Sequence, residues 1–169
     1  PHIIKSERSA LNDHIFKQVS GVVYSETVMA HIRNATKGSC NILNTHPFQF
    51  GNWVFAHNGN IKDFKKYKKK LLMEIKPELR RFVLGETDSE LIFYSLLSDL
   101  SEKIELEKKY CPIDLLSESV KETIGRICDY IGPFLEDDTG ENTETYLSFI
   151  LTNGKTMIAH QGGKDLYYS

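Results

Sequence analysis

Apolar and polar residues recur along this chain with two periods, one typical of helices and the other typical of strands. Apolar residues keep helical spacing in residues 9–19, 63–75, 87–101 and 116–131. Strand-like runs occupy residues 22–32, 52–56, 146–151 and 155–160. This mixture of segments predicts an α+β fold.

Local signals mark the ends of two of these elements. Thr87 and Glu90 have the spacing of a capping box, in which the hydroxyl and the carboxylate bind unpaired amides at a helix start. Asn153-Gly154 lies between the last two strands, where this dipeptide favours a type I′ hairpin turn. The sequence therefore predicts a helix that starts at Thr87 and a C-terminal β-hairpin.

A second Asn-Gly pair, Asn58-Gly59, follows the strand predicted at residues 52–56. A hairpin would need a returning strand of alternating residues, whereas residues 60–64 lead into a helical pattern. We therefore expect the strand to lead through a loop into a helix. At such an exit the Asn58 amide and the Gly59 N–H can point to one spot, as stabilisation of a tetrahedral oxyanion requires.

Length and charge narrow the class of protein. The 169 residues are the size of one domain, and 40% hydrophobic with 26% charged residues is ordinary for a soluble globular protein. The net charge of −2 argues against a nucleic-acid binder, which needs clustered excess Lys and Arg. The Lys-rich residues 65–70 are a local exception, typical of a solvated helix face. No apolar run is long enough to span a membrane.

The cysteines and histidines give little sign of a metal or a disulfide. Cys40, Cys111 and Cys128 are odd in number and lack CxxC spacing, which favours a reducing, cytoplasmic setting. The histidines lack HxxxH or HExxH spacing, so we expect no metal, and His46 and His57 are interpreted as orienting or packing residues. No phosphate-binding loop or dinucleotide fingerprint indicates a cofactor.

Three groups of polar residues at predicted element ends can converge on a small zwitterion. Arg33 follows an apolar run and can bind a carboxylate through two hydrogen bonds, or form a structural ion pair with an acid such as Glu26. Asn58 and Gly59 supply an amide and a backbone N–H. Asp88 can bind an ammonium group, or complement the dipole of its own helix. From the residues alone these alternatives stay open.

These motifs together carry a resemblance to a known family. They read Arg33-x-Ala35-Thr36-x-Gly38, Asn44-Thr45-His46-Pro47-Phe48, Ala56-His57-Asn58-Gly59 and Thr87-Asp88-Ser89-Glu90. In this order they resemble the class II glutamine amidotransferases, and within them the stand-alone branch that acts as amidases on glutamine or other γ-glutamyl compounds. The resemblance implies the four-layer αββα sandwich of the N-terminal-nucleophile hydrolases. It also implies that residues 1–169 form one such domain, which we expect to be truncated at both ends.

The resemblance also implies roles for particular residues. Asn58 and Gly59 would stabilise the oxyanion, Arg33 and Thr36 would bind the α-carboxylate of glutamine, and Asp88 would bind its α-ammonium group. The implied reaction is amide hydrolysis or ammonia transfer through a cysteine thioester. The expected partner of the protein is a small-molecule γ-glutamyl substrate. We expect no cofactor, metal, nucleic acid or membrane to take part. A homo-oligomer or a partner protein is a further alternative.

The chain departs from the family pattern at its first residue. The family uses an N-terminal cysteine as nucleophile, and this chain begins with Pro1. The cysteine can lie in a preceding segment, the protein can be a non-catalytic γ-glutamyl or amino-acid binding module, or an internal cysteine can replace it. The last is weakest, since an internal cysteine has no α-amine to act as base. We expect a preceding segment, and so expect the chain alone to be inactive. An interaction domain that uses the Lys-rich helix is a further alternative.

Overall fold

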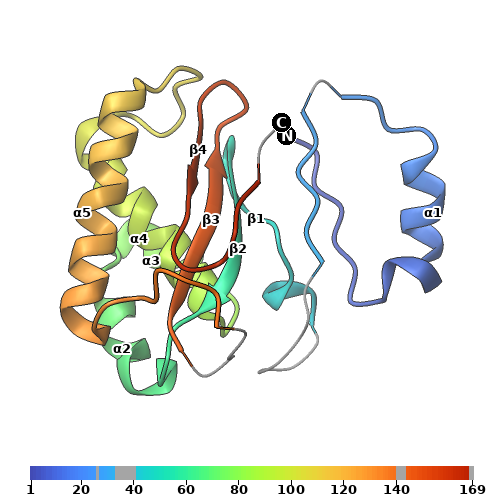
Figure 1. The fold of residues 1–169 in the computed structure, drawn as a ribbon. Helices are drawn as coiled ribbons and strands as arrows, with labels where there is room; N and C mark the ends of the chain where they lie inside the picture. Colours follow the sequence, from blue (N-terminus) through green and yellow to red (C-terminus); the bar gives the residue numbers. More distant parts are fainter. Residues whose placement is uncertain (26, 33–40, 140–143, 168–169) are drawn as a thin grey trace.

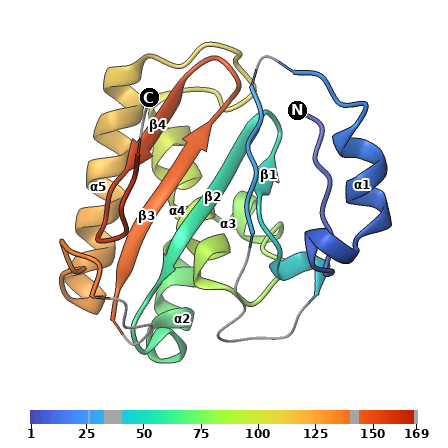
Figure 2. The ribbon, with the colours of Figure 1, turned by 45° about the vertical axis from the view of Figure 1, so that its right-hand side comes forward.

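The computed structural model describes residues 1–25, 27–32, 41–139 and 144–167. Its sheet has four antiparallel strands in the order β1-β2-β3-β4, as Figure 2 shows. The strands are β1 (Phe48–Phe50), β2 (Trp53–Asn60), β3 (Tyr146–Thr152) and β4 (Met157–His160). Because β2 and β3 pair along their length from Val54–Thr152 to Asn60–Tyr146, they form the centre of the sheet.

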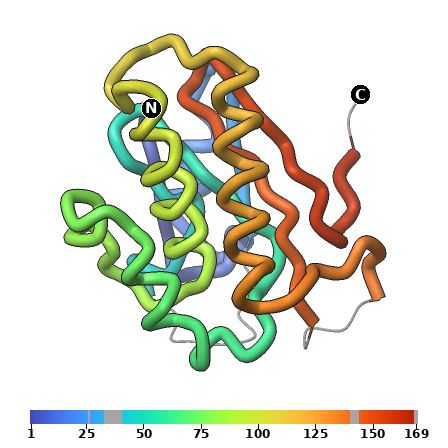
Figure 3. Tube along the Cα trace, turned by 90° about the vertical axis from the view of Figure 1, so that its left-hand side faces the viewer, coloured from blue at the N-terminus to red at the C-terminus, as the bar shows by residue number. Residues whose placement is uncertain are grey.

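Helices cover one face of this sheet. The helical segments are η1 (Ala10–Asn12), α1 (His14–Ser20), η2 (Ile42–Asn44), α2 (Phe64–Glu74), α3 (Pro77–Arg80), α4 (Asp88–Lys103) and α5 (Ile113–Ile131). Helices α4 and α5 lie side by side against the sheet, whereas the N-terminal segment with α1 lies on its other side (Figures 1 and 3). The α+β prediction is confirmed, and the sheet with its helical layer supplies two adjacent layers of an αββα sandwich.

Aromatic side chains from the central strands fill the space between sheet and helices. Phe55 of β2 stacks on Phe93 of α4, with ring centroids 5.4 Å apart, and lies 5.3 Å from the ring of Phe149. Trp53 is fully buried, and its indole N–H donates to the carbonyl of Leu106 over 3.0 Å. Successive strand residues point to opposite faces, so residues 53, 55 and 57 point toward the helices and Asn58 points away.

The helices with strong apolar periodicity form as predicted. Helices α2, α4 and α5 cover the predicted ranges, and Ile92, Leu96 and Leu100 are buried on α4. Among the helices of the described ranges, none is long and apolar enough to cross a membrane.

Only half of the predicted capping box is present. The Thr87 hydroxyl accepts a hydrogen bond from the Glu90 N–H over 3.2 Å. The Glu90 carboxylate instead accepts from the N–H groups of Leu84 and Gly85, over 3.0 and 2.7 Å. The predicted reciprocal hydrogen bond, from the Thr87 N–H to the Glu90 carboxylate, is therefore wrong. The loop before α4 instead supplies this carboxylate with two N–H donors.

The strand predicted at residues 22–32 is also wrong. The structure has no strand in residues 22–25 and 27–32, and Val22, Tyr24 and Ile32 are exposed. Alternation of apolar residues makes a strand only where a neighbouring strand and a second layer are present to pair with it. The predicted apolar face of residues 9–19 is likewise solvent-exposed.

The two Asn-Gly pairs have different structures. The C-terminal hairpin is confirmed, but only Gly154 of its dipeptide has a positive φ, 84°, so the turn is not type I′. The Asn153 carboxamide oxygen instead accepts from the N–H groups of Lys155 and Thr156 and closes a longer loop. Asn58-Gly59 continues β2, after which the chain enters α2, so the predicted strand-to-helix exit is confirmed with a longer strand.

Candidate active site

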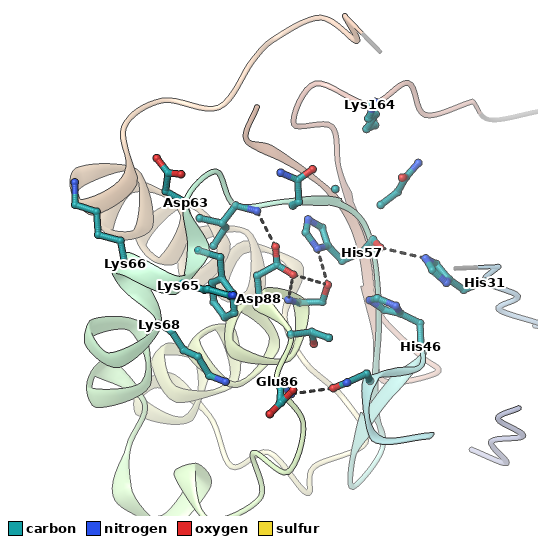
Figure 4. Close-up of a pocket in the computed structure, with 18 of the residues that line it drawn as sticks. His31, His46, His57, Asp63, Lys65, Lys66, Lys68, Glu86, Asp88 and Lys164 are labelled. Atoms are coloured by element: carbon teal, nitrogen blue, oxygen red, sulfur yellow. Dashed lines mark hydrogen bonds between the residues drawn. The ribbon is translucent and has the colours of Figure 1, made fainter. Parts of the chain in front are cut away.

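A pocket of ≈ 1290 Å³ opens where the chain leaves β2 for α2 (Figure 4). The end of β2, the start of α2 and the first turn of α4 contribute to its wall. Three residues predicted from the sequence line it, namely Asn58, Gly59 and Asp88. Arg33 and Thr36, the two others, lie outside the described residues.

The backbone of Gly59 faces the open edge of β2. Gly59 lies opposite Leu147 in β3, but the Leu147 N–H donates to Gly162 on the far side of β3. The pair is therefore of the non-hydrogen-bonded kind, and the Gly59 N–H points away from β3. His57 has the same parity, and its carbonyl lies 3.1 Å from the His31 ring nitrogen Nε2, also away from β3. The Gly59 N–H can therefore serve as a donor outside the sheet.

Gly59 also occupies a position where only glycine fits. A Cβ atom added there would lie 2.6 Å from Nε2 of His57 and would collide with the carbonyl of Tyr146. The neighbouring Asn58 side chain is exposed on the opposite face from His57. The Asn58 amide and the Gly59 N–H therefore lie on the same short stretch of pocket wall.

Asp88 begins α4 and faces the exit of β2. One carboxylate oxygen accepts from the Ile61 N–H over 2.7 Å, and the other accepts from the Ser89 N–H over 2.8 Å. The side chain therefore ties the helix start to the chain beyond β2. Each carboxylate oxygen can accept a further hydrogen bond, so a half-buried Asp88 can also bind a cationic group in the pocket.

His57 lies beneath this wall and is buried. Its Nε2 lies 3.0 Å from the Tyr146 carbonyl, and its Nδ1 lies 2.9 Å from the Ser89 hydroxyl. Burial lowers the pKa of His57, although the charge of Asp88 opposes this shift. The prediction that His57 orients or packs is therefore consistent with its contacts.

The loop before α4 is held by two polar side chains. The buried Asn44 accepts from the Glu86 N–H over 2.8 Å, and Glu90 accepts from the two preceding amides. Burial raises the pKa of Glu90, and its hydrogen bonds from Leu84 and Gly85 oppose that shift. This loop forms the side of the pocket below Asp88.

Lysines contribute to the pocket in a way that the sequence did not indicate. Lys65, Lys66 and Lys68 of α2 line it, and Lys164 lines it from the segment after β4 (Figure 4). The Lys-rich run was expected as a solvated face, because helical periodicity alone does not reveal which neighbouring segment lies beside it.

Neither described cysteine lines this pocket. Cys111 lies beside the β3–β4 loop, where its carbonyl accepts from the Thr156 hydroxyl over 2.8 Å. That loop and the pocket lie at opposite ends of β3, about 20 Å apart. Burial raises the pKa of both the Cys111 and the Cys128 thiol, which disfavours the thiolate form. Cys40 lies outside the described residues, and within those residues no three His, Cys, Asp or Glu side chains gather as a metal site would require.

The sequence matches the class-II glutamine amidotransferases over residues 3–169, and the chain therefore belongs to this family. It is 32% identical over 161 residues to the probable glutamine amidotransferase DUG3 of Saccharomyces cerevisiae, a match that covers 94% of this chain and 45% of that protein. It is 37% identical over 142 residues to a putative glutamine amidotransferase of Haemophilus influenzae, covering 82% of this chain and 40% of that protein.

A solved structure supports the fold. The glutamine aminotransferase class-II domain protein from Silicibacter pomeroyi has a TM-score of 0.64 to this chain at 24% identity. The match covers 94% of this chain and 60% of that chain. The chain spans less than half the length of the Saccharomyces cerevisiae and Haemophilus influenzae relatives.

Proposed function

We propose that this domain binds glutamine or another γ-glutamyl compound and cleaves its side-chain amide, releasing ammonia or passing it to an acceptor. The observation that carries this proposal is the meeting of Asn58, Gly59 and Asp88 in one pocket at the end of β2. Membership of the glutamine amidotransferase family supports the substrate class.

The proposed chemistry needs two donors at the reacting carbonyl. When a thiolate attacks the γ-amide, the carbonyl oxygen becomes a tetrahedral oxyanion that must be stabilised. The Gly59 N–H is directed away from β3, and the Asn58 amide lies beside it. We assign these two groups to the oxyanion.

The other end of the substrate carries an α-ammonium and an α-carboxylate. Asp88 is the assigned ligand of the ammonium group, because its carboxylate lines the pocket close to the β2 exit. Arg33 and Thr36 are the assigned ligands of the carboxylate, on the strength of the family resemblance. The thioester is assigned to an N-terminal cysteine of the full-length protein, since Cys111 and Cys128 do not line the pocket. The cysteine pattern favours a cytoplasmic setting for this reaction.

Ammonia release from glutamine by the full-length protein tests the proposal. Asn58→Ala should lower kcat by about 10²–10³ with little change in KM, because the oxyanion exists only along the reaction path. The matched control is Gln49→Ala, which removes an exposed carboxamide near the other end of β2. A rise in KM with kcat intact, or equal losses in both variants, would contradict the oxyanion assignment.

A further inference from the structure

His57 joins three elements beneath the pocket wall. It belongs to β2, its Nε2 contacts the Tyr146 carbonyl of β3 over 3.0 Å, and its Nδ1 contacts the Ser89 hydroxyl of α4 over 2.9 Å. The imidazole is only 2% exposed. Its hydrogen bonds therefore act in a region from which water is excluded.

These contacts determine which nitrogen carries the proton. A carbonyl oxygen only accepts, so Nε2 must donate to Tyr146. In the neutral ring Nδ1 then accepts, and the single hydrogen of the Ser89 hydroxyl is donated to it over 2.9 Å, since the alternative acceptor, an Asp88 carboxylate oxygen, lies 3.4 Å away. Burial lowers the pKa of His57 and so favours this neutral form.

A second set of hydrogen bonds connects the same part of β2 to the start of α4. Ser89 is adjacent to Asp88, whose carboxylate accepts from the Ser89 N–H over 2.8 Å and from the Ile61 N–H over 2.7 Å. Positions 57 and 61 are therefore both fastened to the first turn of α4. Asn58 and Gly59 lie between these two attachments in the sequence.

The imidazole of His57 also packs closely beneath the backbone of Gly59. A Cβ at Gly59 would lie 2.6 Å from Nε2 of His57, so the imidazole contacts the glycine backbone directly. A change in the position of the imidazole would therefore also displace the backbone of Gly59, including its N–H.

We propose that His57 is a positioning residue that, through Ser89, fixes the Asn58-Gly59 donors relative to Asp88. This inference rests on the proposed function, in which Asn58 and Gly59 bind the oxyanion and Asp88 binds the other end of the same substrate. Preorganised donors are effective because they need no rearrangement as charge develops, and a misplaced donor loses much of that effect.

The first experiment removes the Ser89 hydroxyl and leaves His57 in place. In the full-length protein, Ser89→Ala should lower kcat for glutamine about tenfold, the equivalent of one hydrogen bond, with KM nearly unchanged. The matched control is Ser98→Ala, which also deletes a buried hydroxyl with two hydrogen bonds, about 13 Å further along α4. The control should retain the kcat of the parent protein.

A double-mutant cycle separates positioning from a general loss of structure. In an Asn58→Ala background one of the two donors that Ser89 helps to position is absent, while the Gly59 N–H remains, so Ser89→Ala should lower kcat by clearly less than about tenfold further. An undiminished tenfold loss in that background, or the same loss from Ser98→Ala, would overturn the inference. If Asn58→Ala leaves kcat intact, the proposed function itself fails at the oxyanion, which is a different outcome.

A measurement without turnover tests the same positioning. In nitrogen-15 NMR spectra, His57 should show a neutral ring protonated at Nε2, and Ser89→Ala should shift the Nδ1 signal and the amide signals of Asn58 and Gly59. Ser98→Ala should leave these signals in place. Unchanged Asn58 and Gly59 signals in Ser89→Ala would overturn the inference whatever the protein's activity.

Discussion

At the scale of single residues, Asp88 combines a structural contact with an assigned ligand contact. Its carboxylate binds two backbone N–H groups and still lines the pocket. Asp88→Asn keeps a carbonyl oxygen for one of these amides but removes the negative charge. We expect it to weaken glutamine binding by about 1.5–3 kcal/mol, the range for a hydrogen bond to a charged group. Isothermal titration calorimetry measures this change.

The control for Asp88 is a second acid in the same pocket. Glu86→Gln removes an exposed carboxylate that also lines the pocket, and it should leave glutamine affinity nearly unchanged because solvent screens an exposed charge. Equal weakening in both variants would mean that the overall charge of the pocket, and not Asp88 in particular, sets affinity.

His57 makes the stability of the protein depend on pH in a defined direction. Its pKa is lowered in the fold, chiefly by burial, with Asp88 opposing the shift and His160 adding to it. Below the ordinary histidine pKa of about 6.5 the unfolded chain binds more protons, so this group's contribution to stability is lost as the pH falls. The variant His57→Gln has no titrating group at this position, so its stability lacks this pH dependence. The difference in free energy of unfolding between the parent protein and the variant should therefore become smaller from pH 7.5 to pH 5.5. Urea unfolding at both pH values measures this difference, and a constant difference would contradict the lowered pKa.

At the scale of elements, the start of α4 carries both the cap and the site. Thr87 is the N-cap, and its hydroxyl accepts from the Glu90 N–H. Thr87→Ala should lower the free energy of unfolding by about 1 kcal/mol, whereas Thr87→Ser should retain most of it because the hydroxyl remains. Chemical denaturation compares the two variants. Equal destabilisation would show that the threonine methyl group, not the cap, matters.

The elements that the sequence predicted are those determined by local information. The buried stripe of α5 and the spacing within α4 are properties of one helix, so periodicity was sufficient to find them. The strand at residues 22–32 was wrong because pairing depends on a neighbour far away in the sequence. The capping residue Thr87 was found, whereas the partners of Glu90 were not, since they lie in a loop whose path no local rule gives.

The candidate site shows the same limit. Asn58, Gly59 and Asp88 were identified through motifs, but the direction of the Gly59 N–H follows from the register between β2 and β3, in which Gly59 pairs with Leu147, 88 positions further along the chain. The Ser89 contact with His57 is equally non-local and had no sequence signal beyond the adjacent motif. The sequence therefore indicated three residues that line one pocket, and the register of the sheet determines the direction of the Gly59 N–H.

At the scale of the whole molecule, the described cysteines and the pocket lie apart. Cys111 lies beside the β3–β4 loop at the far end of the sheet, and neither it nor Cys128 lines the pocket. Thioester formation needs sulfur within about 3–3.5 Å of the reacting carbonyl carbon. An internal cysteine, Cys40 included, also lacks an α-amine to act as its base, so we expect the 169-residue chain to bind glutamine but to release no ammonia from it. The full-length protein should release ammonia, and an electrophilic glutamine analogue should label its N-terminal cysteine, as peptide mass spectrometry can determine. Cys40→Ser, Cys111→Ser and Cys128→Ser in the full-length protein should each leave turnover unchanged. Ammonia release by the 169-residue chain that any one of these substitutions abolishes would assign the nucleophile to an internal cysteine instead.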